Sequence, residues 1–365
     1  MFSAHLEADN VRMGQQAAVA RREGDLIRRC YSGLRGAAFQ DAVMRSVHAL
    51  LPVDAIFFAT ADPTTLLFNG AVAEGPLAAA TEQFINNEFG TDDVNKFQSL
   101  AITGRHVTTL DSATGGHRAG SARYREIMAP LGLGDELRAA LVTPSGCWGY
   151  LCLHRADSAH GFSTAEIRQI GRLAAHLGDG CRRSLTVPFS GAVAGSEPGV
   201  IVLHPDLTVA ATTGEAERWL AHIPDHRPER GQLPAAVYAV AARLQLIHRG
   251  DAQPGMSPSV RVPDLAGGWL LLHASRLDDA PDADIAVVIE PAHPGSLTPL
   301  LLSSWGLSRR ERDVAFLVLR GASTQEIAAE LHLSAYTVKD HIKSIFDKTG
   351  VRSRRDLVAH VLTGG

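Results

Sequence analysis

The chain of 365 residues is poor in cysteine and has no long apolar stretch. Its four cysteines are too few and too widely spaced for a disulfide framework, which favours a reducing compartment. No apolar run approaches the roughly 18 residues of a membrane span, and the first residues lack the basic and apolar segments of a secretory signal. These absences predict a cytoplasmic protein that makes no contact with a membrane. A hydrophobic content of 45% suffices for buried cores, and the length predicts two or three domains.

Lysine is also scarce, and charge is distributed unevenly. The chain has only four lysines, and Lys339, Lys343 and Lys348 lie in one short segment. Residues 301–365 contain ten Lys and Arg against seven Asp and Glu, whereas the other residues contain 25 against 32. The net charge of −4 argues against a general nucleic-acid binder, but a basic end on an acidic body predicts an anion-binding module attached to something else.

Helix and strand patterns alternate in the first half of the chain. Apolar residues at steps of three and four predict helices, short apolar runs predict strands, and Ser163 with Glu166 is typical of a capping box. The predicted segments are a helical region at 12–50, strands at 53–59 and 66–68, helices at 77–89 and 121–130, strands at 137–142 and 148–154, and a helix from Ser163 to about Cys181. This order predicts an α+β domain over residues 1–185.

A second α+β domain is predicted over residues 199–292, after a linker at 186–199 that contains several Pro and Gly residues. Its segments are a hairpin of 200–203 with 207–210, helices near 214–221 and 234–248, and strands at 259–263, 269–275 and 284–290. Residues 297–365 are predicted to form a third, all-α domain.

The third domain has four short helices with clear start signals. Ser308 with Glu311 and Ser323 with Glu326 are typical of capping boxes. The second and third helices are separated by a tight turn, which is the layout of a helix-turn-helix. The third helix is predicted over 335–349 and would be about 22 Å long, enough to lie along a DNA major groove.

The third helix has two different faces. One stripe is predicted to pack on the second helix: Val338, Ile342, Ile345 and Thr349. The opposite face is polar and contains Tyr336, Lys339, Asp340 and Lys343. Two lysines one turn apart on an exposed face suit a phosphate-lined groove, whereas a basic face alone is also typical of a solvated helix in an ordinary bundle.

The order of residues in this segment is more specific than its charge. It runs Leu307-Ser308-x-x-Glu311, then Gly321-x-Ser323-x-x-Glu326-Ile327-Ala328-x-x-Leu331-x-Leu333-Ser334-x-x-Thr337-Val338-Lys339-x-His341, then Lys348-x-Gly350-Val351-x-Ser353-Arg354. This pattern resembles the LuxR/GerE-type DNA-binding domain almost position by position.

The resemblance implies a four-helix domain that binds promoter DNA through its third helix. By position, Lys339, Asp340 and Lys343 would face the bases, while Ser334, Thr337 and His341 would lie nearer the DNA backbone. Asp340 can accept a hydrogen bond from a cytosine amino group, so it would act on specificity rather than on affinity. The family also implies a homodimer formed by the last helix, 353–362, with Leu357, Val358 and Val361 as contacts.

Two further resemblances concern the first three hundred residues. Residues 30–182 look like a GAF-type sensor domain and are similar to the N-terminal region of actinobacterial LuxR-type regulators. That likeness depends on Tyr124-Arg125-Glu126, on Leu131-Gly132-Leu133-Gly134-Asp135-Glu136-Leu137-Arg138 and on Cys147-Trp148-Gly149-Tyr150-Leu151-Cys152-Leu153-His154-Arg155. Residues 199–290 resemble a PAS domain in the order of their elements.

A ligand site is predicted in the first domain. Trp148, Tyr150, Cys152 and His154 alternate along one strand and should share one face of it. Together with Phe57, this aromatic wall beside a polar group suits a small, mostly apolar effector molecule. The predicted lining is Phe57, Trp148, Tyr150 and His154, and the alternative is that these side chains simply pack against the helices of the domain.

Neither a metal site, a cofactor nor catalysis is predicted. Cys147 and Cys152 differ by five positions, so they should face opposite sides of a strand, which argues against one tetrahedral site shared with His154 and favours buried apolar cysteines. No Gly-x-Ser-x-Gly sequence, Walker loop or dinucleotide-binding fingerprint is present. The chain is therefore not expected to be an enzyme.

These observations predict a one-component transcription regulator that senses a small molecule and binds DNA as a dimer. One alternative is a phosphorelay response regulator, for which Asp54 is the candidate phosphoacceptor. That alternative lacks an acidic pair after a first strand, and Arg105 stands where a lysine is needed. A second alternative is an enzyme-like sensor domain fused to a DNA-binding tail. The effector, the operator and the direction of regulation stay open.

Overall fold

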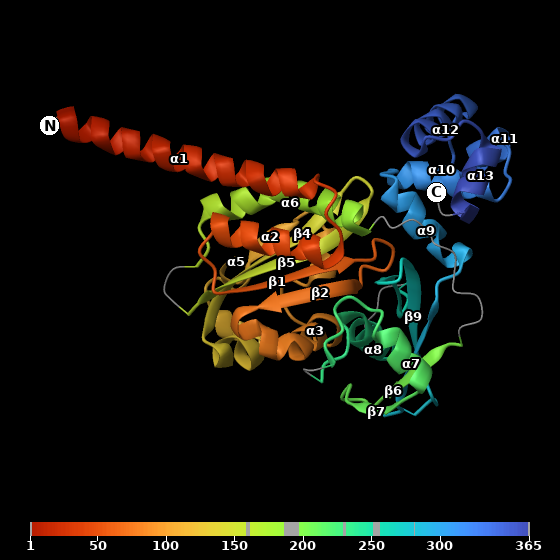
Figure 1. Cartoon of the computed structure of the whole chain (residues 1–365), viewed down its shortest axis with the longest axis horizontal. Coiled ribbons are helices and arrows are strands. Elements are labelled where there is room, and N and C mark those ends of the chain that lie inside the picture. The colour runs from red at the N-terminus through yellow and green to blue at the C-terminus, as the bar shows by residue number, and fades with distance from the viewer. Residues whose placement is uncertain are drawn as a thin grey trace.

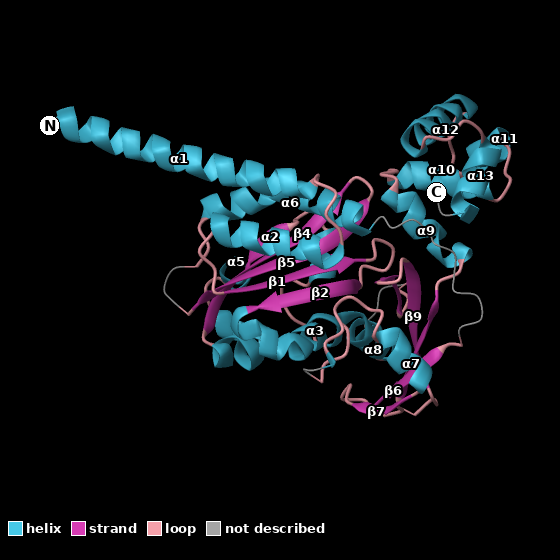
Figure 2. Ribbon diagram, in the orientation of Figure 1, coloured by secondary structure: helices cyan, strands magenta, loops and turns pink. Residues whose placement is uncertain are grey.

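The computed structural model describes residues 2–157, 161–185, 197–228, 231–250, 256–280 and 282–363. It contains two five-stranded antiparallel sheets, each with its own helices, followed by a helical module at the C-terminal end (Figure 1 and Figure 2). The predicted α+β, α+β, all-α order is confirmed at this level. Most of the predicted linker, 186–196, lies outside the described residues.

The first unit is a sheet with helices on both faces. Its strands are β1 Ala55–Ala61, β2 Phe68–Glu74, β3 Val107–Thr109, β4 Leu133–Thr143 and β5 Gly146–Ala156, in the order β2-β1-β5-β4-β3. Its α-helices are α1 Phe2–Cys30, α2 Gly36–Leu50, α3 Thr81–Gly90, α4 Phe97–Ile102, α5 Leu110–Thr114 and α6 Thr164–Leu185. Short 3-10 and π turns lie at Gly75–Ala80, Arg118–Gly120, Tyr124–Met128 and Ala129–Leu131.

Alternation along β1 divides the core of this unit. Phe57 points to the face that α3 and α4 cover, where its ring lies 4.9 Å from that of Phe84. Phe58 points to the opposite face, which α2 and α6 cover, and its ring lies 6.2 Å from that of Phe39. Figure 1 shows α2 and α6 on one side of the sheet and α3 on the other. Both faces of β1 are therefore buried, which explains its continuous apolar sequence.

A β-bulge between β4 and β5 changes the predicted faces of β5. Ala140 pairs with Tyr150 and Val142 pairs with Cys147, so β5 has one residue more than β4 over this stretch. Trp148 consequently packs with the cluster on the α6 side, whereas Tyr150 and Cys147 belong to the cluster on the α3 side with Cys152. The prediction that Trp148 shares a face with Tyr150 is wrong, and so is the prediction that the two cysteines face opposite sides.

The second unit has the strands β6 Gly199–Leu203, β7 Val209–Thr212, β8 Ser259–Asp264, β9 Gly268–Arg276 and β10 Ile285–Pro291, in the order β7-β6-β10-β9-β8. Its helices are α7 Gly214–Leu220 and α8 Ala235–His248. The apolar helix α8 lies between the two units and contacts α3 and β2 of the first and β9 of the second. Buried Asp62 of the first unit pairs with Arg261 of the second at 2.7 Å, so the units form one continuous core.

The C-terminal module consists of α9 Pro294–Ser304, α10 Arg309–Leu319, α11 Thr324–Glu330, α12 Ala335–Thr349 and α13 Arg354–Thr363. The four predicted helices correspond to α10–α13. Helix α9 connects the module to the first unit, because Leu297 and Leu300 belong to the core beneath α6 while Leu302 belongs to the core of the module. None of the described helices has the length and hydropathy of a membrane span.

Candidate DNA-binding site and buried sensor core

The turn between α11 and α12 is held by local hydrogen bonds. The backbone N–H of Leu333 donates to the carbonyl of Ala328 at 2.9 Å, and His332 adopts a left-handed conformation with φ of 54°. Ser334 then caps α12, since its Oγ accepts a hydrogen bond from the N–H of Thr337 at 3.0 Å. The capping boxes predicted at Ser308 and Ser323 are both present. These bonds define where the helices of the module begin and where α11 turns into α12.

Helix α12 presents the predicted polar face to solvent. Val338 and Ile345 are buried in the core of the module. Tyr336 has 75% of its surface exposed, and Lys339, Asp340 and Lys343 are exposed beside it. Among the residues predicted to lie near the DNA backbone, Ser334 is exposed, whereas Thr337 and His341 are half-buried. The arrangement of the two faces is confirmed, and base or phosphate contact by any of these residues stays a prediction.

Glu311 fixes α12 against α10, a role that the sequence did not reveal. Its carboxylate accepts hydrogen bonds from Lys348 Nζ at 2.7 and 2.8 Å and from Ser344 Oγ at 2.6 Å, in addition to its capping contact with Ser308. Partial burial would raise the pKa of Glu311, but these donors outweigh it and lower the pKa to about 2. Lys348 therefore has a structural partner, and the free positive charge of α12 comes from Lys339 and Lys343.

The predicted dimer contacts lie at different depths. Leu357 is fully buried in the core of the module, and Val361 is 4% exposed. Val358 is half-buried, and α13 packs against α9 and α10 of the same chain. A partner subunit can therefore reach Val358 in the described arrangement, but it reaches Leu357 and Val361 only if α13 shifts.

The DNA-binding module is docked on the first unit by polar contacts as well as by α9. Arg312 of α10 donates a hydrogen bond from Nη1 to the carbonyl of Ser145, in the turn between β4 and β5. Arg182 of α6 donates to the carbonyl of Ser304, the last residue of α9, at 2.5 Å. Figure 1 shows α12 on the outer side of the module, away from the sheets, so this docking leaves its polar face open.

The predicted ligand residues are buried in a dense aromatic cluster. Phe57, Trp148, Tyr150 and His154 all have no exposed surface. The ring of Tyr150 stacks on that of Phe97 at 4.7 Å, and its hydroxyl donates to the carbonyl of Leu66 at 3.1 Å. Burial raises the pKa of Tyr150 well above its ordinary value. Three of the four residues thus lie together on the α3 side, and Trp148 lies apart from them.

A buried network of charges lies beside this cluster. Arg123 Nη2 is 2.6 Å from Glu136 Oε2, and Arg138 Nη1 is 2.6 Å from Glu88 Oε2. The guanidinium of Arg138 also lies over the ring of Phe97, 4.3 Å from its centre. Burial alone would raise the pKa of Glu136, but the guanidinium groups of Arg123 and Arg138 hold it well below its usual range. Charged residues inside the apolar strand at 133–143 are the signal that could have predicted such a network.

Cys152 and His154 adjoin this network. Cys152 Sγ lies 3.2 Å from both Glu136 Oε1 and His154 Nε2. Burial raises the pKa of the Cys152 thiol well above its ordinary value and lowers the pKa of His154 to about 4. The imidazole is therefore neutral at physiological pH. Asp54, the candidate phosphoacceptor, lies before β1, where its carboxylate accepts a hydrogen bond from the N–H of Ala156 at 2.7 Å.

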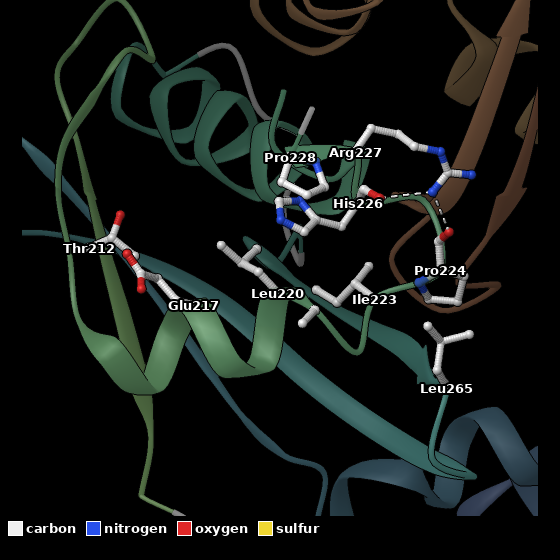
Figure 3. Close-up of a pocket in the computed structure, with 10 residues that line it drawn as sticks. Thr212, Glu217, Leu220, Ile223, Pro224, His226, Arg227, Pro228 and Leu265 are labelled. Carbon is white, nitrogen blue, oxygen red and sulfur yellow. Dashed lines mark hydrogen bonds between the residues drawn. The ribbon is translucent and has the colours of Figure 1, made fainter. Parts of the chain in front are cut away.

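Two cavities of ligand size lie elsewhere. One of about 440 Å³ is formed at the C-terminal end of α3, between the first unit and α8, and includes Lys96, Ile102, Leu246 and Arg249. Another, of about 590 Å³, adjoins α7 (Figure 3), and Leu220, Ile223 and Leu265 contribute its apolar side chains. Figure 3 also shows the guanidinium of Arg227 turned to the carbonyls of Pro224 and His226, at 2.9 and 2.8 Å.

Comparison with known proteins identifies the C-terminal module. The model of the family described as bacterial regulatory proteins, luxR family, matches residues 306–361. The HTH-type transcriptional regulator MalT of Klebsiella pneumoniae is 40% identical over 62 residues, which are 17% of this chain and 7% of MalT. The chain therefore spans only a small part of the length of that relative.

Solved structures with some likeness include SdiA of Escherichia coli, at 11% identity and a TM-score of 0.27, covering 89% of this chain and 90% of that chain. A VqmA–ligand–DNA complex from Vibrio cholerae has 19% identity and a TM-score of 0.23, covering 46% of this chain and 81% of that chain. Such TM-scores do not establish a common overall fold, so GAF-like and PAS-like stay predictions for the two α+β units. Residues 306–361, however, form a helix-turn-helix domain of the LuxR family.

Proposed function

We propose that this chain is a one-component transcription regulator of the cytoplasm. Its C-terminal domain would bind promoter DNA as a homodimer, and its α+β half would sense a small molecule. The main support is the LuxR-family module with α12 exposed along one polar face. A family of DNA-binding regulators points to DNA recognition rather than to an enzymatic reaction.

The geometry of α12 suits a major groove. Lys339 and Lys343 lie one turn apart, and Asp340 stands between them on the same exposed face. The N-terminal end of the helix, capped by Ser334, adds the positive end of the helix dipole. In this proposal Lys339 and Asp340 read base edges, Lys343 neutralises a phosphate, and Ser334, Thr337 and His341 lie toward the DNA backbone.

Dimerisation follows from the small number of base pairs that one helix can read. A symmetric dimer places two recognition helices on a palindromic site, with half-sites about 10 base pairs apart or a multiple of that distance. We place the contact on α13, with Val358 at its accessible surface and Leu357 and Val361 supporting the helix from within.

Selection of duplexes from a random DNA library tests this function. The full chain should enrich a pseudo-palindromic sequence, because two copies of α12 bind related half-sites. Lys339→Ala/Lys343→Ala should enrich no sequence under the same conditions. Enrichment of a single asymmetric half-site contradicts the dimer, and failure of the unaltered chain to enrich any sequence contradicts DNA recognition.

Sensing is supported by the cavity between the α+β units. Its volume of about 440 Å³ falls in the usual range for small-molecule sites, and domain interfaces are common places for them. Two of the predicted ligand residues, Phe57 and Tyr150, lie behind its wall, since Phe89 of the lining contacts Phe68, which in turn contacts both of them. In this proposal Phe57, Tyr150 and His154 support the residues that line the cavity and do not themselves contact the effector.

A thermal-shift screen of metabolites on the full chain examines sensing. An effector present at 100 times its Kd should stabilise the chain by about 2.7 kcal/mol, which raises the melting temperature by several degrees. Leu246→Trp fills the cavity and should remove the shift, while Leu277→Trp changes an exposed leucine and should preserve it. A shift that persists in Leu246→Trp contradicts the assignment to this cavity.

A further inference from the structure

Glu136, Cys152 and His154 bring three different metal-binding atoms together inside the first unit. Glu136 on β4 pairs directly with His154 on β5, and Cys152 stands two residues before His154 on the same face. Cys152 Sγ is 3.2 Å from Glu136 Oε1 and 3.2 Å from His154 Nε2, and Glu136 Oε1 is 4.0 Å from His154 Nε2. All three side chains are fully buried.

These separations are close to those of atoms that share one metal ion. Bonds of 2.0–2.3 Å to S, N and O ligands place the ligand atoms about 3.4–3.7 Å apart in tetrahedral or trigonal sites. The three atoms would need to move by only a few tenths of an ångström. The sequence analysis considered only Cys147 as a further ligand beside Cys152 and His154, and it rejected that set. In the tertiary structure the residue beside Cys152 and His154 is Glu136, from the neighbouring strand.

The polar partners of His154 do not account for its burial. Its Nδ1 has no hydrogen-bond partner among the described residues, and Nε2 faces a thiol, which is a weak partner. An ion bound at Nε2 would replace this weak contact with a metal–nitrogen bond, while Nδ1 would stay without a partner among the described residues.

The charges around the three residues select the kind of ion. Glu88, Asp93 and Glu136 are balanced by Arg123, Arg138 and Lys96. A divalent ion that displaces the thiol proton would add one net positive charge next to two buried guanidinium groups, which is unfavourable. A monovalent ion that displaces the same proton adds none. Thiolate and imidazole ligands suit Zn(II) as well as Cu(I), so the charge balance decides between the two ions, and Cu(I) is the monovalent one.

We propose that Cys152 and His154, with Glu136 as a weaker third ligand, bind one Cu(I) ion or a similar soft monovalent ion. On binding, the Cys152 S–H bond breaks, a Cu–S bond forms and the proton leaves to solvent, so the net charge of the site is unchanged. No electron is transferred. Glu136 is the weakest ligand because its carboxylate already accepts hydrogen bonds from Arg123. The site does not depend on DNA binding.

Anaerobic titration of the full chain with Cu(I), against a coloured Cu(I) chelator, measures the affinity directly. The unaltered chain should take one equivalent from the chelator. Cys152→Ser and Cys152→Ala should each weaken binding by more than about 100-fold, since loss of a ligand should exceed the effect of losing a supporting contact. Cys147→Ser removes a buried free thiol outside the trio and should bind as the unaltered chain does.

X-ray absorption at the copper edge should show one sulfur ligand together with nitrogen or oxygen ligands, and circular dichroism should show that both Cys152 variants are folded. Equal loss in Cys147→Ser, or binding that is unchanged in folded Cys152→Ser and Cys152→Ala, overturns the assignment. Zn(II) tested in the same way should bind far more weakly. Tight binding of Zn(II) that depends on Cys152 overturns the choice of a monovalent ion.

Discussion

Lys339→Ala/Lys343→Ala is expected to weaken promoter binding by on the order of 100-fold while the fold is retained. Both side chains are exposed on α12, and the core contacts of that helix come from Val338 and Ile345. The single variants should differ. Lys343→Ala should weaken binding to all sequences and reduce the slope of log affinity against log salt by about one, whereas Lys339→Ala should cost about 1–3 kcal/mol at one base position.

Fluorescence anisotropy with a labelled promoter fragment at several salt concentrations separates these effects. Arg218→Ala removes one exposed positive charge from α7, which lies far from α12 in Figure 1, and should leave the affinity and the salt slope unchanged. Lys348→Ala should lower the stability of the module instead, because Lys348 holds Glu311. If both α12 single variants bind with unaltered affinity and salt dependence, α12 does not lie in the groove.

Arg138→Leu should destabilise the first unit by about 3–5 kcal/mol, because it leaves the buried carboxylate of Glu88 without its cation. Arg138 has no exposed surface, and its guanidinium lies over the rings of Phe97 and Phe84. The change thus removes the ion pairs with Glu88 and Glu136 together with two aromatic contacts. Urea unfolding at neutral pH, followed by tryptophan fluorescence, measures the loss.

A double-variant cycle assigns the cause. Arg138→Leu/Glu88→Gln removes both charges of the pair and should recover a substantial part of the lost stability, since the penalty of an unpaired buried charge is gone. Arg28→Leu breaks an exposed ion pair with Asp25 and should cost less than about 1 kcal/mol. A loss in Arg138→Leu no larger than that in Arg28→Leu would show that the network is not desolvated.

The sequence alone determined the elements whose signals are local. Capping residues such as Ser308, Ser323 and Ser334 define where helices begin, because they bond to the backbone within three residues. The spacing of Val338 and Ile345 determined which face of α12 is buried and hence which face carries the lysines. The order of strands and helices was enough to predict two α+β units before an all-α module.

Tertiary structure decided what depends on contacts between distant segments. One extra residue in β5 moved Trp148 to the opposite face, and a pattern of period two contains no signal for such a bulge. Glu311 meets Lys348 and Glu136 meets Arg123 only after folding, when partners distant in sequence lose water together and their attraction becomes strong. Glu136, rather than Cys147, lies beside Cys152 and His154 for a similar reason. Pairing between β4 and β5 decides which side chains share this buried site, and the spacing along one strand does not show it.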